Sequence, residues 1–189
     1  AYGGLRPLVD DQTKGSYETS RKYEVYDNAA DGIEGMITVE GGKYTTSRRL
    51  AENCLKIVAV KLGRNLGKSV TNKQFLAGCE IKDLNFFMNE AREQDNGLSR
   101  TTLEYLARNY GTEYKEIVKL AHEDQALSET LNDDGEIQAQ VVYAARNEMA
   151  RTLSDIVMRR TGIGTLGNPG ETVLRKVAAL AAKELRWDK

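Results

Sequence analysis

The feature that most constrains the fold of this chain is the helical periodicity of its carboxyl-terminal part. From residue 69 to residue 189, apolar side chains recur three and four positions apart, which is the spacing of one face of an α-helix. Ser99 and Thr112 are good N-caps, and Pro169 is suited to the first turn of the last helix. The pattern predicts an all-α domain of about five to seven helices, with segments at 82–94, 99–110, 113–121, 135–160 and 169–185.

The first 68 residues follow a different pattern. Short runs rich in β-formers, 21–26 and 36–40, are separated by turn residues, and a further run at 5–9 contains Pro7, which restricts it to a sheet edge. Gly41 and Gly42 end the second run, and a helix follows that Thr45 or Thr46 can cap. We therefore predict an α+β, mostly α chain, with a small antiparallel strand element and a helix in 1–68 and an all-α domain in 69–189.

The two strands have no other strong strand candidate beside them. Strand edges expose unpaired backbone N–H and C=O groups that can pair with another strand. We therefore expect 21–26 and 36–40 to pair with each other or with a second copy of the chain.

Composition excludes several classes of protein. The chain has 189 residues and a formal net charge of -1, so no global attraction to nucleic acid or acidic lipid is expected. Its two cysteines, Cys54 and Cys79, are far apart in sequence, which argues against a disulfide framework or a zinc site and fits a reducing compartment such as the cytoplasm. No apolar run reaches the roughly 20 residues of a membrane span.

The Gly-Gly-Lys turn is the strongest candidate for a binding site. A glycine turn that leads into a helix leaves backbone N–H groups unpaired at the positive end of the helix dipole, and such a place suits an anion. The same strand, turn and helix is also how many α/β units simply change direction. Both interpretations stay open on this pattern alone.

Four sequence segments together resemble one family. The segments GLRPLV, TSRKYEV, GGKYTTSR and EMARTLSDIVMRRT occur in that order. They are similar to motifs of the FAD-dependent glycerol-3-phosphate dehydrogenase and oxidase family, and the resemblance covers essentially the whole chain. One departure is Ser47, where the family commonly has tyrosine.

The resemblance implies a function and a set of site residues. The parent enzyme would oxidise glycerol 3-phosphate to dihydroxyacetone phosphate, with FAD as cofactor and quinone or another acceptor taking the electrons. Arg6, Arg21 and Lys43 match groups that bind the substrate, and guanidinium forks suit phosphate oxygens. The flavin contacts would come from the turn, namely Gly42, Tyr44, Thr45 and Thr46.

Other parts of that enzyme are missing from the sequence. It shows no strand-borne dinucleotide fingerprint and no histidines matching the family's proton acceptors. We therefore expect a carboxyl-terminal portion that is inactive and without FAD on its own, with the turn facing solvent. Its expected partners are the amino-terminal FAD-binding part of the same protein and a second copy of the chain. The protein is expected in the cytoplasm or on the cytoplasmic face of the inner membrane. Two alternatives remain: a related flavoenzyme acting on another small anionic alcohol, or a helical module for assembly.

Four further patterns are interpreted as structural. LGRNLGKS has one residue too few for a phosphate loop, and GIGTLG follows a predicted helix where a dinucleotide site needs a strand. His122 is expected at a helix end in a capping or solvated role. The pairs Glu148/Arg151 and Asp155/Arg159 are expected to brace a helix pair.

Overall fold

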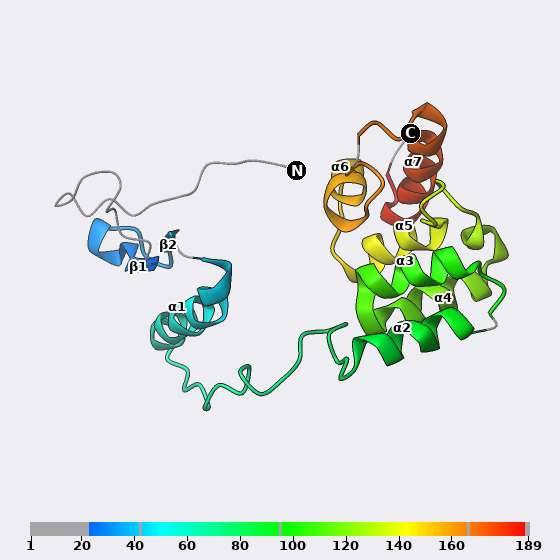
Figure 1. Cartoon of the computed structure of the whole chain (residues 1–189). Helices are drawn as coiled ribbons and strands as arrows, with labels where there is room; N and C mark the ends of the chain where they lie inside the picture. Colours follow the sequence, from blue (N-terminus) through cyan, green and yellow to red (C-terminus); the bar gives the residue numbers. More distant parts are fainter. Residues whose placement is uncertain (1–22, 42, 95, 166, 188–189) are drawn as a thin grey trace, which may run out of the picture. The chain divides into compact units, whose positions relative to one another are not determined.

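The computed structural model describes residues 23–41, 43–94, 96–165 and 167–187 (Figure 1). It divides into two compact units, Ala1–Gln74 and Phe75–Lys189. The described residues are mostly helical, with one two-stranded antiparallel sheet. The predicted fold class is therefore confirmed. The run at 5–9, expected as an edge strand, lies outside the described residues.

The first unit contains a β-hairpin and one helix. Strands β1 (Tyr23–Asp27) and β2 (Ile37–Gly41) pair with each other in antiparallel register, with Val25 opposite Val39. The connection contains a short 3₁₀-helix, η1 (Asn28–Asp31), which Asp27 caps by accepting the N–H of Ala29. Of the two pairings expected for these strands, the structure shows the one within the chain.

Helix α1 (Ser47–Lys61) is tied to the hairpin by polar contacts. Asn53 Nδ2 donates to Tyr23 Oη (2.6 Å), and Lys61 Nζ donates to the carboxylate of Asp27 (2.7 Å). Ala59 is the one residue of α1 that is buried among the described residues, while Leu55 and Val60 are 55% and 81% exposed. These two apolar side chains of α1 are therefore open to solvent.

The second unit is a helical domain. Its helices are α2 (Leu84–Glu93), α3 (Arg100–Tyr110), α4 (Tyr114–Glu123), α5 (Gln138–Asn147), α6 (Leu153–Asp155) and α7 (Glu171–Leu185). Three 3₁₀ or π turns continue or link them: η3 (Gly111–Glu113), η4 (Gln125–Ser128) and the π-helix η5 (Ile156–Arg160). Ser99 caps α3 as predicted, accepting the N–H of Thr102 (3.1 Å).

Helix α5 is the centre of this domain. Seven of its ten residues are buried, because it packs against α4 on one side and α7 on the other (Figure 1). Val142 belongs to a core shared with α2, α3 and α4, whereas its neighbour Val141 belongs to a core shared with η5 and α7. Its buried residues include two glutamines, and Gln140 satisfies its side chain by accepting the N–H of Ile137 (2.8 Å) and donating to Tyr110 Oη (3.0 Å).

The predicted continuous helical stretch 135–160 is wrong. Helix α5 ends at Asn147, and Met149 adopts a left-handed backbone with φ of 58°. The chain then restarts at α6, where Thr152 Oγ1 accepts the N–H of Asp155 (3.1 Å) and the Asp155 carboxylate accepts the N–H of Thr152 (2.9 Å). This reciprocal capping box marks a helix start inside an otherwise periodic segment.

Two other predicted helix starts also need correction. Thr112 lies inside η3, where its N–H donates to the carbonyl of Gly78 (3.0 Å), so it does not cap α4. Helix α7 begins at Glu171, after Gly170 with φ of 89°, and not at Pro169. Among the described residues, none of the helices combines the length and apolarity that a membrane crossing requires.

Candidate functional site

The turn between β2 and α1 is the candidate site in the first unit. Gly41 ends β2 with φ of 72°, and a single 3₁₀ turn, η2 (Tyr44–Thr46), precedes α1. Thr46 Oγ1 accepts the N–H of Lys43 (3.3 Å) and donates to the Lys43 carbonyl (3.0 Å), while Ser47 Oγ donates to the Tyr44 carbonyl (2.8 Å). The turn is thus closed by its own hydroxyl groups.

The predicted side-chain cap of α1 differs from the structure. Thr46 occupies the N-cap position, but its hydroxyl bonds backward to Lys43 and makes no cap bond to α1. The first turn of α1 carries no acidic residue, and its Arg48 pairs with Glu52 one turn later (3.2 Å). An anion near this helix end would therefore meet a positive dipole and no opposing carboxylate from that turn.

The side chains of this turn are open to a ligand. Lys43, Tyr44 and Thr45 are exposed, Tyr44 completely so, and Thr46 is half-buried. Together they present one ammonium group and three hydroxyls on a short segment at the positive end of α1. Arg6, Arg21 and Gly42 lie outside the described residues, so their placement beside Lys43 stays a prediction.

The glycine-rich loop 162–167 has a structural role that depends on Glu136. The carboxylate of Glu136, which is 1% exposed, accepts from Tyr105 Oη (2.6 Å), the N–H of Gly162 (2.7 Å) and Asn132 Nδ2 (2.5 Å). A Cβ on Gly162 would lie 2.3 Å from Tyr105 Oη. Burial, and next the hydrogen bond to Glu136, raise the pKa of the Tyr105 hydroxyl well above its usual range.

Contacts within the domain explain two of the motif's glycines, Gly162 and Gly164, without a cofactor. Gly164 is needed for packing, since a Cβ there would lie 2.6 Å from Met158 Sδ and 2.7 Å from Val157 Cγ1. The segment follows the π-helix η5 and not a strand, which confirms its interpretation as a loop. The sequence did not mark Glu136 as important, because it is one of three acids in the polar stretch NDDGE and no periodic pattern sets it apart.

The predicted charge pairs are partly correct. Arg159 Nη1 binds Asp155 (2.9 Å), within one turn. The pair Glu148/Arg151 is wrong: Oε2 of Glu148 is buried without a hydrogen-bond partner among the described residues, and burial raises the pKa of this carboxyl against the opposing effect of Arg160. One ion pair that does brace two helices is Arg146 with Glu184, joined by two bonds of 2.7 and 2.8 Å between α5 and α7.

The remaining candidate residues have ordinary surroundings. His122 lies in the last turn of α4, where its Nε2 is 3.0 Å from the carbonyl of Asn96. Cys54 and Cys79 are free thiols, and residues 63–70 lie in an irregular segment after α1. In the part of the chain that the structure describes, no group of three or more His, Cys, Asp or Glu could hold a metal ion.

Comparison with known proteins connects the helical domain to a family. A family model described as the C-terminal domain of alpha-glycerophosphate oxidase matches residues 69–189. The chain belongs to this family. The resemblance drawn from the sequence motifs is thereby confirmed, and relatives that are similar to this chain over most of its length are named glycerol-3-phosphate dehydrogenases.

Three relatives show how far the similarity extends. The glycerol-3-phosphate dehydrogenase of Synechocystis sp. is 35% identical over 88% of this chain and 30% of its own length. The mitochondrial glycerol-3-phosphate dehydrogenase of Homo sapiens is 30% identical over 100% of this chain and 26% of its own length. Glycerol-3-phosphate dehydrogenase 2 of Mycobacterium bovis is 29% identical over 98% of this chain and 32% of its own length. The chain therefore spans about a third or less of the length of these relatives, and it corresponds to their carboxyl-terminal portion.

Proposed function

We propose that this chain is the carboxyl-terminal part of an FAD-dependent glycerol-3-phosphate dehydrogenase. The parent enzyme oxidises glycerol 3-phosphate to dihydroxyacetone phosphate, and FAD, when bound, accepts the hydride and passes electrons to quinone or another acceptor. The observation that carries this proposal is the exposed turn Lys43–Thr46 at the amino end of α1, in a chain whose relatives are named glycerol-3-phosphate dehydrogenases. The amino-terminal FAD-binding part of the protein completes the site.

The residues of the turn suit both ligands. The N-terminal end of α1 offers a positive dipole and no carboxylate from its first turn, which favours the negative charge that a reduced flavin carries. Gly42, Tyr44, Thr45 and Thr46 would contact the flavin through this segment. Lys43 is an exposed cation that can hold substrate oxygens, while Arg6 and Arg21 would bind the phosphate through paired N–H donors.

The test is flavin reduction in the enzyme that contains both parts. Anaerobic addition of glycerol 3-phosphate should abolish the visible absorbance of the oxidised flavin, whereas glycerol, which lacks the phosphate, should act at least about a hundredfold less efficiently because two guanidinium contacts are lost. Lys43→Met should lower the second-order rate of reduction at least about tenfold. Lys56→Met is the matched control, because Lys56 pairs with Glu52 on the surface of α1.

Three results would contradict the proposal. Equal reduction rates for Lys43→Met and the Lys56→Met control would remove Lys43 from the substrate site. Flavin reduction by a different small anionic alcohol, with none by glycerol 3-phosphate, would favour a related flavoenzyme. A full-length protein that binds no flavin would instead favour the assembly module.

A further inference from the structure

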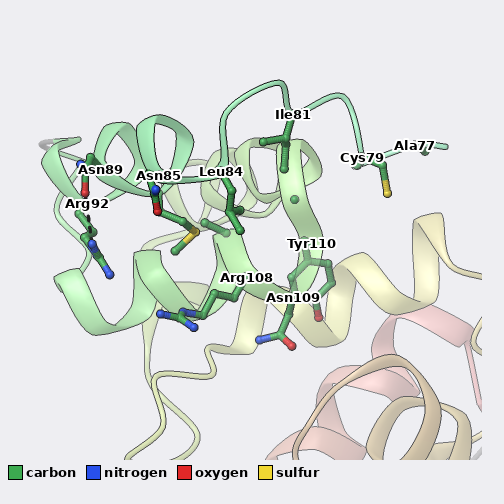
Figure 2. A pocket seen from close by; sticks show the side chains of 14 residues that line it. Ala77, Cys79, Ile81, Leu84, Asn85, Asn89, Arg92, Arg108, Asn109 and Tyr110 are labelled. Atoms are coloured by element: carbon green, nitrogen blue, oxygen red, sulfur yellow. Dashed lines mark hydrogen bonds between the residues drawn. The ribbon is translucent and has the colours of Figure 1, made fainter. Parts of the chain in front are cut away.

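A cavity of about 700 Å³ lies in the helical domain, between α2, the end of α3 and the segment 77–81 that leads into α2 (Figure 2). We call this segment the strap. Its position is set by a close backbone crossing: Gly78 O accepts the N–H of Thr112 (3.0 Å), and a Cβ on Gly111 would lie 1.8 Å from that oxygen. Gly78 and Gly111 have φ of 80° and 54°. The strap is therefore held over the cavity by backbone contacts that only glycine permits at both positions.

One edge of the cavity is polar. Asn85, Asn89 and Arg92 are four and three residues apart on α2, so they lie on one face of the helix. Arg108 and Asn109 line the cavity from α3, and Figure 2 shows Asn85, Asn89 and Arg92 on one helix with Arg108 and Asn109 on another. Nη1 of Arg108 and the amide of Asn85 make no hydrogen bond among the described residues, so both are available to a ligand.

This edge carries excess positive charge. Glu104 lies between the two arginines, with Arg92 Nη2 at 3.0 Å and Arg108 Nη2 at 2.7 Å from its Oε1. These contacts lower the pKa of the Glu104 carboxyl to about 2, chiefly through the hydrogen bonds to Arg92 and Arg108, so it stays ionised. Two guanidinium groups thus share one carboxylate, and one positive charge is left without a partner in this group.

The rest of the cavity is apolar. Leu84 and Met88 of α2, Ala107 of α3 and Ile81 of the strap line it, and Figure 2 shows Leu84 near Asn85 and Ile81 on the strap. Met88 and Ala107 are buried members of the domain core, so this wall is fixed by packing. Apolar lining with a few convergent polar groups is the usual character of a small-molecule site, and the volume falls in the usual range.

We propose that this cavity binds a small amphipathic acid with a single negative charge. Its carboxylate would bind Arg108 and the Asn85 amide at the polar edge, and its aliphatic body would lie against Leu84, Met88 and Ile81 beneath the strap. A singly charged head matches the single unpaired positive charge. The cavity-lining residues all lie between Ala77 and Gly111, so the proposal does not rest on the turn at Lys43 or on the proposed flavin site.

The test uses the 189-residue chain and octanoate as probe. In ¹H–¹⁵N NMR titrations, octanoate should bind saturably with a Kd of about 1 mM or tighter, and the shifted amides should fall in 77–92 and 107–111. Arg108→Gln should weaken binding about tenfold, because one charge-assisted hydrogen bond is lost. Asn85→Trp, at an exposed position of α2, should weaken it at least as much by filling the cavity. Arg175→Gln is the control, since Arg175 pairs with Glu171 on the distant surface of α7.

Comparison of probes distinguishes the head from the body. Acetate should bind much more weakly than octanoate because it has no aliphatic body. Octanol should also bind much more weakly than octanoate, because it has no charge. Equal affinities for octanol and octanoate would overturn the assignment of an anionic head. Unchanged octanoate binding in both Arg108→Gln and Asn85→Trp, or amide shifts elsewhere in the domain, would overturn the site itself.

Discussion

Single residues carry strong constraints in the helical domain, and Gly162 is the clearest case. Its N–H donates to the buried carboxylate of Glu136, which also accepts a hydrogen bond from the hydroxyl of Tyr105. A Cβ at this position would overlap that hydroxyl. A buried carboxylate is tolerated when several donors satisfy it. The same position in sequence looks like one glycine of a nucleotide motif, and only the surrounding contacts show why glycine is required.

Gly162→Ala should destabilise the domain by about 1.5–3 kcal/mol, because the new Cβ would displace Tyr105 from its hydrogen bond to a buried charge. Gly67→Ala is the control, since Gly67 has nothing within 4 Å of an added Cβ, and it should change the free energy of unfolding by less than about 0.5 kcal/mol. Urea unfolding, followed by the fluorescence of the single tryptophan, Trp187, measures both. Similar values for the two variants would contradict the role of Gly162.

Glu148 should make stability depend on pH. Burial raises the pKa of its carboxyl, so the folded state binds the proton more tightly than the unfolded state does. The stabilisation of the folded state by the protonated Glu148 carboxyl is fully present below the pKa of that group in the unfolded chain. It is lost as the pH rises through the pKa of the group in the folded chain. The stability of Glu148→Gln relative to the parent chain should therefore increase as the pH rises above the usual pKa of a glutamate. A constant difference in the urea midpoint over this rise in pH would show that Glu148 is not strained when ionised.

At the scale of elements, the stability that an ion pair contributes depends on how far its side chains are buried. Arg146 joins α5 to α7 by a two-bond contact to Glu184, whose side chain is only 14% exposed. Arg175 makes a similar contact to Glu171 within α7, but both side chains are more than three-quarters exposed. Water screens the second pair far more than the first.

Arg146→Ala should therefore destabilise the domain by about 1 kcal/mol, whereas Arg175→Ala should cost less than about 0.5 kcal/mol. Urea unfolding of the two variants at low salt provides the comparison. The opposite order would mean that the contact between α5 and α7 is set by apolar packing alone.

The strap is a second element whose position has a testable cause. Gly111→Ala should destabilise the domain by at least about 3 kcal/mol, because the new Cβ would overlap the backbone carbonyl of Gly78, which cannot rotate away as a side chain can. Gly63→Ala is the matched control: Gly63 also has positive φ, 59°, but has nothing within 4 Å of an added Cβ. A similar loss for both variants would attribute the effect to backbone strain and not to the crossing.

At the scale of the whole molecule, the segment between α1 and α2 separates two units. Residues 62–83 form no helix or strand, and Arg64, Lys68 and Lys73 within them are exposed. Exposed irregular segments are the preferred sites of proteolysis. The first cuts by trypsin should therefore fall after these three residues and release a resistant helical fragment, which mass spectrometry would identify. First cuts inside α2 to α5 would contradict a domain boundary in this segment.

The sequence by itself determined the class of the fold, both strands, most helices and the family. These features depend on local periodicity, on caps such as Ser99, and on motifs that are contiguous in the chain. Only the tertiary structure decided where the stretch 135–160 breaks, why Gly162 and Gly111 must be glycine, and that Arg146 braces α5 against α7. Those outcomes depend on residues that are distant in sequence, such as Glu136 with Gly162, Gly78 with Gly111 and Arg146 with Glu184. Local spacing carries no information about contacts that exist only once the helices have packed.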